Sequence, residues 1–165
     1  MKQILEENNR RNLALSKPYD PIKGVGCIGE RTRVNASHLG FSAEVWLPNS
    51  MLADEKYLVA STNVDSWVKL RCHHDFEFWC ATCVKIKDKL SGQDIPFYLN
   101  APQRRVAATF ESQRTSSIPI RAIMLKARQW GGSTLTQMYM AWIQSVHCHN
   151  WHSLICTGHR TKCIM

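Results

Sequence analysis

The sequence from Arg121 to Thr134 reads RAIMLKARQWGGST, and it decides the predicted fold. Residues 121–126 are apolar and favour a β-strand, and a loop follows over 127–132. From Ser133 to His147 apolar residues recur at three- and four-residue steps, which predicts an amphipathic helix. A second apolar strand is predicted over 151–156. Strand, loop, helix and strand together form one βαβ unit, which implies a parallel sheet. The apolar face of the helix consists of Leu135, Met138, Tyr139, Trp142, Ile143 and Val146.

The loop has the chemistry of a phosphate site. A loop that ends a strand and opens a helix points backbone N–H groups at one spot, and the helix dipole adds positive potential there. Gly131 and Gly132 allow the positive φ angles and the close approach that a phosphate needs. A hydroxyl in the first helical turn, from Ser133 or Thr134, can ligate Mg²⁺.

The loop departs from the usual pattern G-x-x-x-x-G-K-[ST] at two positions. Gly132 replaces the lysine before the hydroxyl, and Lys126 replaces the leading glycine. Lys126 at the strand end and Arg128 inside the loop are the cations that remain near a bound phosphate. The alternative is a plain strand-to-helix turn with a basic rim and no nucleotide.

The run from Lys126 to Thr134, followed by a helix that ends in Trp-Ile-Gln at 142–144, resembles the variant phosphate loop of the large terminase subunits of tailed bacteriophages. Those proteins are the ATPase motors that package DNA, and their loop often has Arg-Gln before a glycine, as at Arg128 and Gln129 here. The resemblance implies an incomplete P-loop NTPase sheet that binds ATP and Mg²⁺. It makes Lys126 and Arg128 phosphate contacts and Ser133 the Mg²⁺ ligand. The loop residues it assigns to the nucleotide are Lys126, Arg128, Gln129, Gly131, Gly132, Ser133 and Thr134.

Residues 96–103, PFYLNAPQ, resemble the adenine-binding segment of the same family, in which a Gln upstream of the phosphate loop recognises the base. A Gln side chain offers one donor and one acceptor group, which match the N7 and N6 positions of adenine. The resemblance therefore assigns Gln103 to the base. The alternative is a solvated Gln in the first turn of a helix.

Other parts of the motor have no counterpart after Glu111, because no Asp or Glu follows it in the chain. The downstream carboxylates that hold Mg²⁺ and activate water, and an acidic nuclease site, are therefore not supplied by this stretch. We expect the N-terminal part of a terminase large subunit that binds Mg-ATP without hydrolysing it. The resemblance further implies double-stranded DNA, the small terminase subunit and the portal protein as partners, in the host cytoplasm at the procapsid portal.

The chain divides into three predicted regions. Residues 1–48 are expected to form an extended arm, because prolines and glycines punctuate them. Residues 49–89 are expected to be helical, with a helix over 51–59 capped by Asn49 or Ser50, a second one capped by Asp65 or Ser66, and a break near 73–75. Residues 90–165 form the truncated ATPase core, with a hairpin of 84–88 and 95–99 at its start and a helix from Asn100 to about Gln113. The whole is an α/β protein whose one βαβ unit follows a helical and extended N-terminal region.

Composition limits the function classes. The 165 residues carry 21 basic and 13 acidic side chains, and the net charge of +8 falls entirely on residues 83–165. A basic half favours an anionic partner such as nucleic acid or nucleotide phosphate. The first residues are polar and mixed in charge, unlike a signal peptide, and the apolar run 138–143 is far too short to span a bilayer. Seven cysteines without a secretion signal are expected to be reduced thiols.

Two alternatives stay open. Cys72-His73-His74 and the pair Cys80 and Cys83 have soft metal ligands, so the chain is alternatively a zinc-stapled nucleic-acid-binding module. On a helix, however, Cys80 and Cys83 share one face and act as small hydrophobic groups. The His-Cys-His run at 147–149 is a weaker metal candidate. The other alternative is an inactive remnant, in which an incomplete sheet leaves an exposed edge that promotes aggregation.

Overall fold

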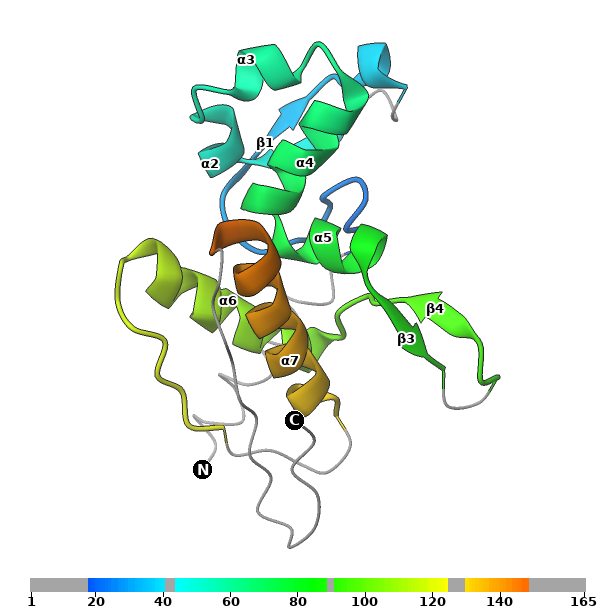
Figure 1. Ribbon diagram of the computed structural model, residues 1–165, viewed down its shortest axis with the longest axis vertical. Coiled ribbons are helices and arrows are strands. Elements are labelled where there is room, and N and C mark those ends of the chain that lie inside the picture. Colours follow the sequence, from blue (N-terminus) through cyan, green and yellow to red (C-terminus); the bar gives the residue numbers. More distant parts are fainter. Residues whose placement is uncertain (1–17, 41–43, 89–90, 125–129, 149–165) are drawn as a thin grey trace, which may run out of the picture.

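The computed structural model describes residues 18–40, 44–88, 91–124 and 130–148. It is a mixed α/β structure in which both sheets are two-stranded and antiparallel within the described ranges. Figure 1 places β1, α2, α3 and α4 at one end, α6, α7 and the β3–β4 hairpin at the other, and α5 between them. The elements are β1 (Arg31–Val34), a 3-10 turn η1 (Ser37–Leu39), β2 (Val45–Pro48), α2 (Asn49–Leu52), α3 (Tyr57–Ala60), α4 (Val64–His74), α5 (Phe76–Cys83), β3 (Lys85–Lys87), β4 (Asp94–Pro96), α6 (Ala101–Thr115), α7 (Gly132–Trp142) and a π-helical end η2 (Ile143–His147).

The first end of the molecule is built on the β1–β2 pair, in which Arg31 lies opposite Pro48 and Val34 opposite Val45. Strand β2 alternates so that Val45 and Leu47 point inward while Trp46 is exposed, as a half-buried strand requires. Residues 31–48 were expected to belong to an arm, and they instead supply four of the six members of a small core. That core consists of Ala36, Leu39, Val45, Leu47, Met51 and Trp67.

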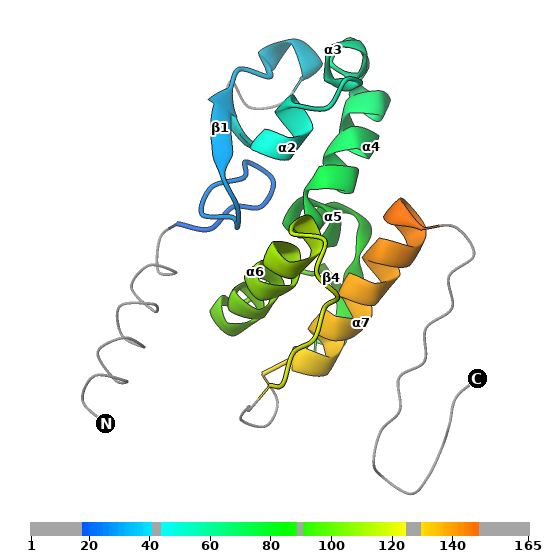
Figure 2. The same ribbon diagram turned by 90° about the vertical axis from the view of Figure 1, so that its left-hand side faces the viewer.

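The second end packs α5, α6 and α7 around a larger core. Figure 2 shows α6 and α7 side by side below α5. Phe76 of α5 contacts Tyr139 and Trp142 of α7, with ring centroids 5.0 and 5.3 Å apart. Such tilted aromatic pairs add to the free energy gained from burial alone. This core consists of Phe76, Cys80, Val84, Phe97, Leu99, Ala107, Phe110, Leu135, Tyr139 and Trp142.

Several local predictions are confirmed. The hairpin forms between β3 and β4, with Ile86 opposite Ile95. Helix α6 begins after Asn100, and a helix covers residues 132–147 as α7 and η2. The predicted break falls at Asp75, which ends α4 and caps α5 by accepting a hydrogen bond from Phe78 N.

Other expectations are corrected. The helix predicted over 51–59 is two short helices, because the Asp54 carboxylate accepts from Lys56 N and stabilises a turn between them. Asn63, not Asp65 or Ser66, caps α4. Residues 121–124 are irregular rather than a strand. The parallel sheet therefore has no support in the described residues, and positions 125, 126 and 151–156 lie outside them.

None of the helices in the described ranges combines the length and the apolar character needed to cross a bilayer. The longest, α6, runs from Ala101 to Thr115 and buries polar side chains such as Gln103.

Candidate functional site

A cleft of about 650 Å³ lies between the β3–β4 hairpin and the start of α7. It brings together the two segments that the sequence singled out separately, since Gln103 lines it beside the glycine loop. Lys126, Arg128 and Gln129 fall outside the described residues. The lining residues are Ile86, Lys87, Asp88, Ile95, Phe97, Asn100, Gln103, Trp130, Gly131, Gly132, Ser133 and Thr134.

Gln103 joins helix α6 to the loop. Its Nε2 donates to Gly131 O at 3.0 Å, and its Oε1 accepts from Asn100 N at 2.9 Å. Asn100 Oδ1 accepts from Gln103 N in return, which completes a capping box. The side chain is only 4% exposed, so Gln103 is not the solvated Gln of the alternative interpretation. The amide group of Gln103 therefore uses a donor and an acceptor to fix the loop to the start of α6.

Asn100 makes the second connection to the loop. Its Nδ2 donates to Trp130 O at 3.1 Å. The start of α6 therefore holds two consecutive carbonyl groups of the loop, one through each amide side chain. This arrangement fixes the direction in which the chain enters α7.

The two glycines are required by their surroundings. Gly131 is the N-cap of α7 with φ +83°, a conformation that L side chains rarely adopt, and a Cβ there would lie 2.5 Å from Gln103 Nε2. A Cβ at Gly132 would overlap the indole ring of Trp130. Trp130 thus occupies the space that a side chain at position 132 would need, so glycine is required there.

The start of α7 is open toward the cleft. The first N–H groups of a helix have no partner within the helix, and here they belong to Gly132, Ser133 and Thr134. Ser133 is exposed and Thr134 is half-buried, so both hydroxyls are near solvent. Together with the helix dipole these groups favour an anion. Across the cleft, Lys87 pairs with Asp94 at 2.9 Å, and Asp88 Oδ2 accepts hydrogen bonds from Ser91.

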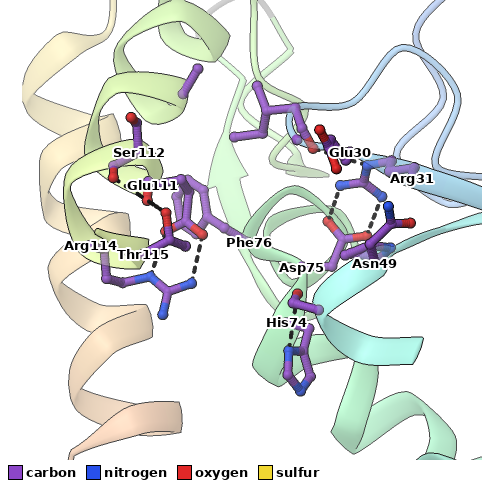
Figure 3. Close-up of a pocket in the computed structure, with 15 residues that line it drawn as sticks. Glu30, Arg31, Asn49, His74, Asp75, Phe76, Glu111, Ser112, Arg114 and Thr115 are labelled. Atoms are coloured by element: carbon purple, nitrogen blue, oxygen red, sulfur yellow. Dashed lines mark hydrogen bonds and ion pairs between the residues drawn. The ribbon is translucent and has the colours of Figure 1, made fainter. Parts of the chain in front are cut away.

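A second cavity, of about 420 Å³, lies between the β1–β2 end and the end of α6 (Figure 3). Two ion pairs line it: Arg31 holds Asp75, and Arg114 holds Glu111 through Nε and Nη2. Figure 3 shows these pairs on opposite sides of the cavity.

His74 also lines this cavity, with Nδ1 3.2 Å from Ser50 Oγ and Nε2 2.9 Å from Asp54 Oδ2. The Asp-His-Ser chain connects α2 to the end of α4. No sequence spacing indicated it, because the three residues come from different elements.

Buried charges connect the N-terminal segment to α4 and α5. Burial alone would raise the pKa of Asp75, but the guanidinium groups of Arg31 and Arg71 hold that pKa below its usual range. Arg71 is fully buried and also donates to the carbonyl groups of Pro21 and Ile22. Burial raises the pKa of Glu77 to about 6, against the opposing effects of the Ile28 N–H and Arg31. These contacts secure residues 18–31 against the helices.

The zinc alternative has no ligand set among the described residues, where no group of three or more His, Cys, Asp or Glu side chains is placed to hold a metal. Cys80 is fully buried in the larger core and acts there as a small hydrophobic group. Cys72 and Cys83 lie with their Sγ atoms 4.0 Å apart.

Comparison of the chain with protein-family models, with curated proteins and with solved structures finds no match.

Proposed function

We propose that this chain binds Mg-ATP in the cleft at the start of α7, as the N-terminal nucleotide-binding part of a DNA-packaging ATPase that resembles phage large terminase subunits. The observation that carries the proposal is the pair of hydrogen bonds from Asn100 and Gln103 to the carbonyls of Trp130 and Gly131. Gln103 and Gly131 are 28 positions apart, and they bring the two segments that resemble the family's adenine and phosphate elements to one cleft.

In this proposal the phosphates lie against the N–H groups of Gly132, Ser133 and Thr134, where the helix dipole favours negative charge. The Ser133 hydroxyl ligates Mg²⁺. Gln103, which lines the cleft, recognises adenine through its side-chain amide. Lys126, Arg128 and Gln129 take the roles that the resemblance assigns to them.

The cleft is suited to binding rather than to hydrolysis. Asp88 lines it, but its Oδ2 already accepts hydrogen bonds from the N–H and the hydroxyl of Ser91. We therefore propose that the chain holds nucleotide, while further carboxylates are needed to activate water. By the same resemblance, its partners are double-stranded DNA, a small terminase subunit and a portal protein, and its place is the host cytoplasm at the procapsid portal.

Titration with a fluorescent ATP analogue in the presence of Mg²⁺ tests the proposal. We expect Lys126→Ala, Arg128→Ala and Ser133→Ala each to weaken binding by about tenfold, since a charge-assisted contact contributes about 1.4 kcal/mol or more. Arg121→Ala is the matched control, because Arg121 is a nearby exposed cation outside the loop. Unchanged affinity in all three loop variants would contradict the proposal that this loop binds the phosphates.

A further inference from the structure

Cys72 and Cys83 form a thiol pair that the sequence did not indicate. Their Sγ atoms lie 4.0 Å apart, one from the last turn of α4 and the other from the last residue of α5. The spacing Cys-x-x-Cys points instead to Cys80 and Cys83, but Cys80 is turned into the larger core. The corner at Asp75 folds α5 back on α4, and this fold brings position 83 to position 72.

The two thiols differ in access. Cys83 is exposed, whereas Cys72 is 8% exposed. Burial and, to a smaller extent, the neighbouring Cys83 raise the pKa of Cys72 to about 12. An oxidant in solution therefore meets Cys83 first.

We propose that Cys72 and Cys83 form a reversible disulfide that locks the end of α4 to the end of α5. A bonded pair has its sulfur atoms about 2 Å apart, so side-chain rotation must close about 2 Å from the present separation. The oxidant is a low-molecular-weight disulfide such as oxidised glutathione.

The reaction proceeds by two exchanges. The Cys83 thiolate attacks one sulfur of glutathione disulfide, whose S–S bond breaks and releases one glutathione thiolate. The Cys72 thiolate then attacks Cys83 Sγ, and the second glutathione thiolate leaves. The two protons lost by the cysteines end on the two glutathione thiols, and two electrons pass from the protein to the oxidant.

The bond closes a loop that spans 11 positions and contains Asp75 and Glu77. Both carboxylates bind the N-terminal segment, through Arg31 and Ile28 N. Trp142 Nε1 donates to Cys72 O at 2.7 Å, so the locked corner also supports α7. Because the cross-link restricts the unfolded chain, we expect the oxidised form to melt at least about 3 °C higher than the reduced form.

The test treats the full chain with oxidised glutathione, blocks remaining thiols and identifies linked peptides by mass spectrometry. We expect a cross-link between Cys72 and Cys83 that a dithiol reductant removes. Cys72→Ser should instead accumulate a glutathione adduct on Cys83. Cys80→Ala is the matched control, because it removes the neighbouring thiol and should leave the cross-link intact.

Two outcomes overturn the proposal. One is a stable glutathione adduct on Cys83 in the unaltered protein with Cys72 still free. The other is a cross-link between Cys80 and Cys83. Circular dichroism of each variant establishes that it is folded before the cross-link is scored.

Discussion

Asp75 pairs with two arginines and also caps a helix. Its carboxylate is completely buried, accepts two hydrogen bonds from Arg31, lies 3.4 Å from Arg71 Nε and caps α5. A buried carboxylate is tolerated only when cations and donors compensate for its lost hydration. The buried charges of Arg31, Arg71 and Asp75 therefore connect the N-terminal segment to helices α4 and α5.

The ion pair between Arg31 and Asp75 gives the first prediction. Arg31→Ala removes the bidentate partner of a buried carboxylate and should lower the free energy of unfolding by about 3–5 kcal/mol. Arg33→Ala breaks an exposed pair with Glu44 and should cost about 0–1 kcal/mol. Urea unfolding at pH 7 measures both. Similar losses in the two variants would contradict the assigned role of Asp75.

The glycines give the second prediction. Gly29 and Gly131 have nearly the same φ, +82° and +83°, but only at Gly131 does an added Cβ meet a neighbour, Gln103 Nε2. Gly29→Ala should cost about 1 kcal/mol of unfolding free energy, which is the strain of a left-handed conformation. Gly131→Ala should cost clearly more, because Gln103 must also move. Equal losses in urea unfolding would show that the contact between Gln103 and the loop is unimportant.

The ends of α4 and η2 meet through two histidines, whose ring centroids lie 4.2 Å apart. Burial, followed by the charges of His73 and Arg114, lowers the pKa of His147 to about 4, while Glu111 opposes this shift. Burial and the neighbouring His74 also lower the pKa of His73, against the charge of Asp54. An unfolded histidine titrates near 6.5, so the unfolded state binds more protons between pH 6.5 and about 4.

The stability contributed by neutral His147 is thus complete above pH 6.5 and is lost as the pH falls toward 4. Because His147 is partly exposed, we expect the free energy of unfolding to fall by about 1 kcal/mol after solvent screening.

Glu77 acts in the opposite direction, since its raised pKa favours the folded protein as the pH falls from 6 to 4.5. His147→Gln keeps Glu77, so the difference in Tm between this variant and the unaltered protein isolates the histidine. The same Tm difference at pH 7 and pH 4.5 would refute the assignment.

At the scale of elements, sequence reasoning succeeded where the signal is local. The start of α6 follows from Asn100 and Pro102, the break between α4 and α5 from the lost periodicity near Asp75, and α7 from its apolar face. The prediction of a parallel sheet failed at residues 121–124. These residues have strand composition but no pairing partner in the described part of the chain. Strand pairing depends on distant residues, which composition does not reveal.

The candidate site divides in the same way. Gln103 and the glycine loop were found because each has a local pattern. Their mutual contact and the Cys72–Cys83 pair were missed, because they arise from packing between elements. The position of Trp130 against Gly132 was also missed, because it depends on the conformation of the loop. The N-cap of α4 was predicted two or three positions too late, since Asn63, Asp65 and Ser66 are all good capping residues.

The described part of the molecule has two hydrophobic cores, and the buried residues Arg71 and Asp75 lie on α4 and at the α4–α5 corner between them. Arg71 lies over the Phe78 ring at 3.9 Å and near the Trp67 ring at 5.4 Å, and Trp67 belongs to the smaller core. Phe78 also contacts Trp67 edge-on, with centroids 6.4 Å apart. Arg71 pairs with Asp75, which caps α5, the helix that carries Phe76 of the larger core. Trp142 of the larger core also donates to Cys72 O on α4, the helix that carries Trp67 of the smaller core. We therefore expect the two cores to unfold together.

This coupling predicts one cooperative unfolding transition. Leu47→Ala in the smaller core and Leu135→Ala in the larger core should each cost about 2–5 kcal/mol, since both side chains are fully buried. Leu58→Ala is the control and should cost less than about 0.5 kcal/mol, because Leu58 is 77% exposed. In both core variants, tryptophan fluorescence and far-ultraviolet circular dichroism should give coincident denaturation curves. If Leu47→Ala produced two separate transitions, the two cores would unfold independently. The charges around Arg71 would then not couple the stability of one core to that of the other.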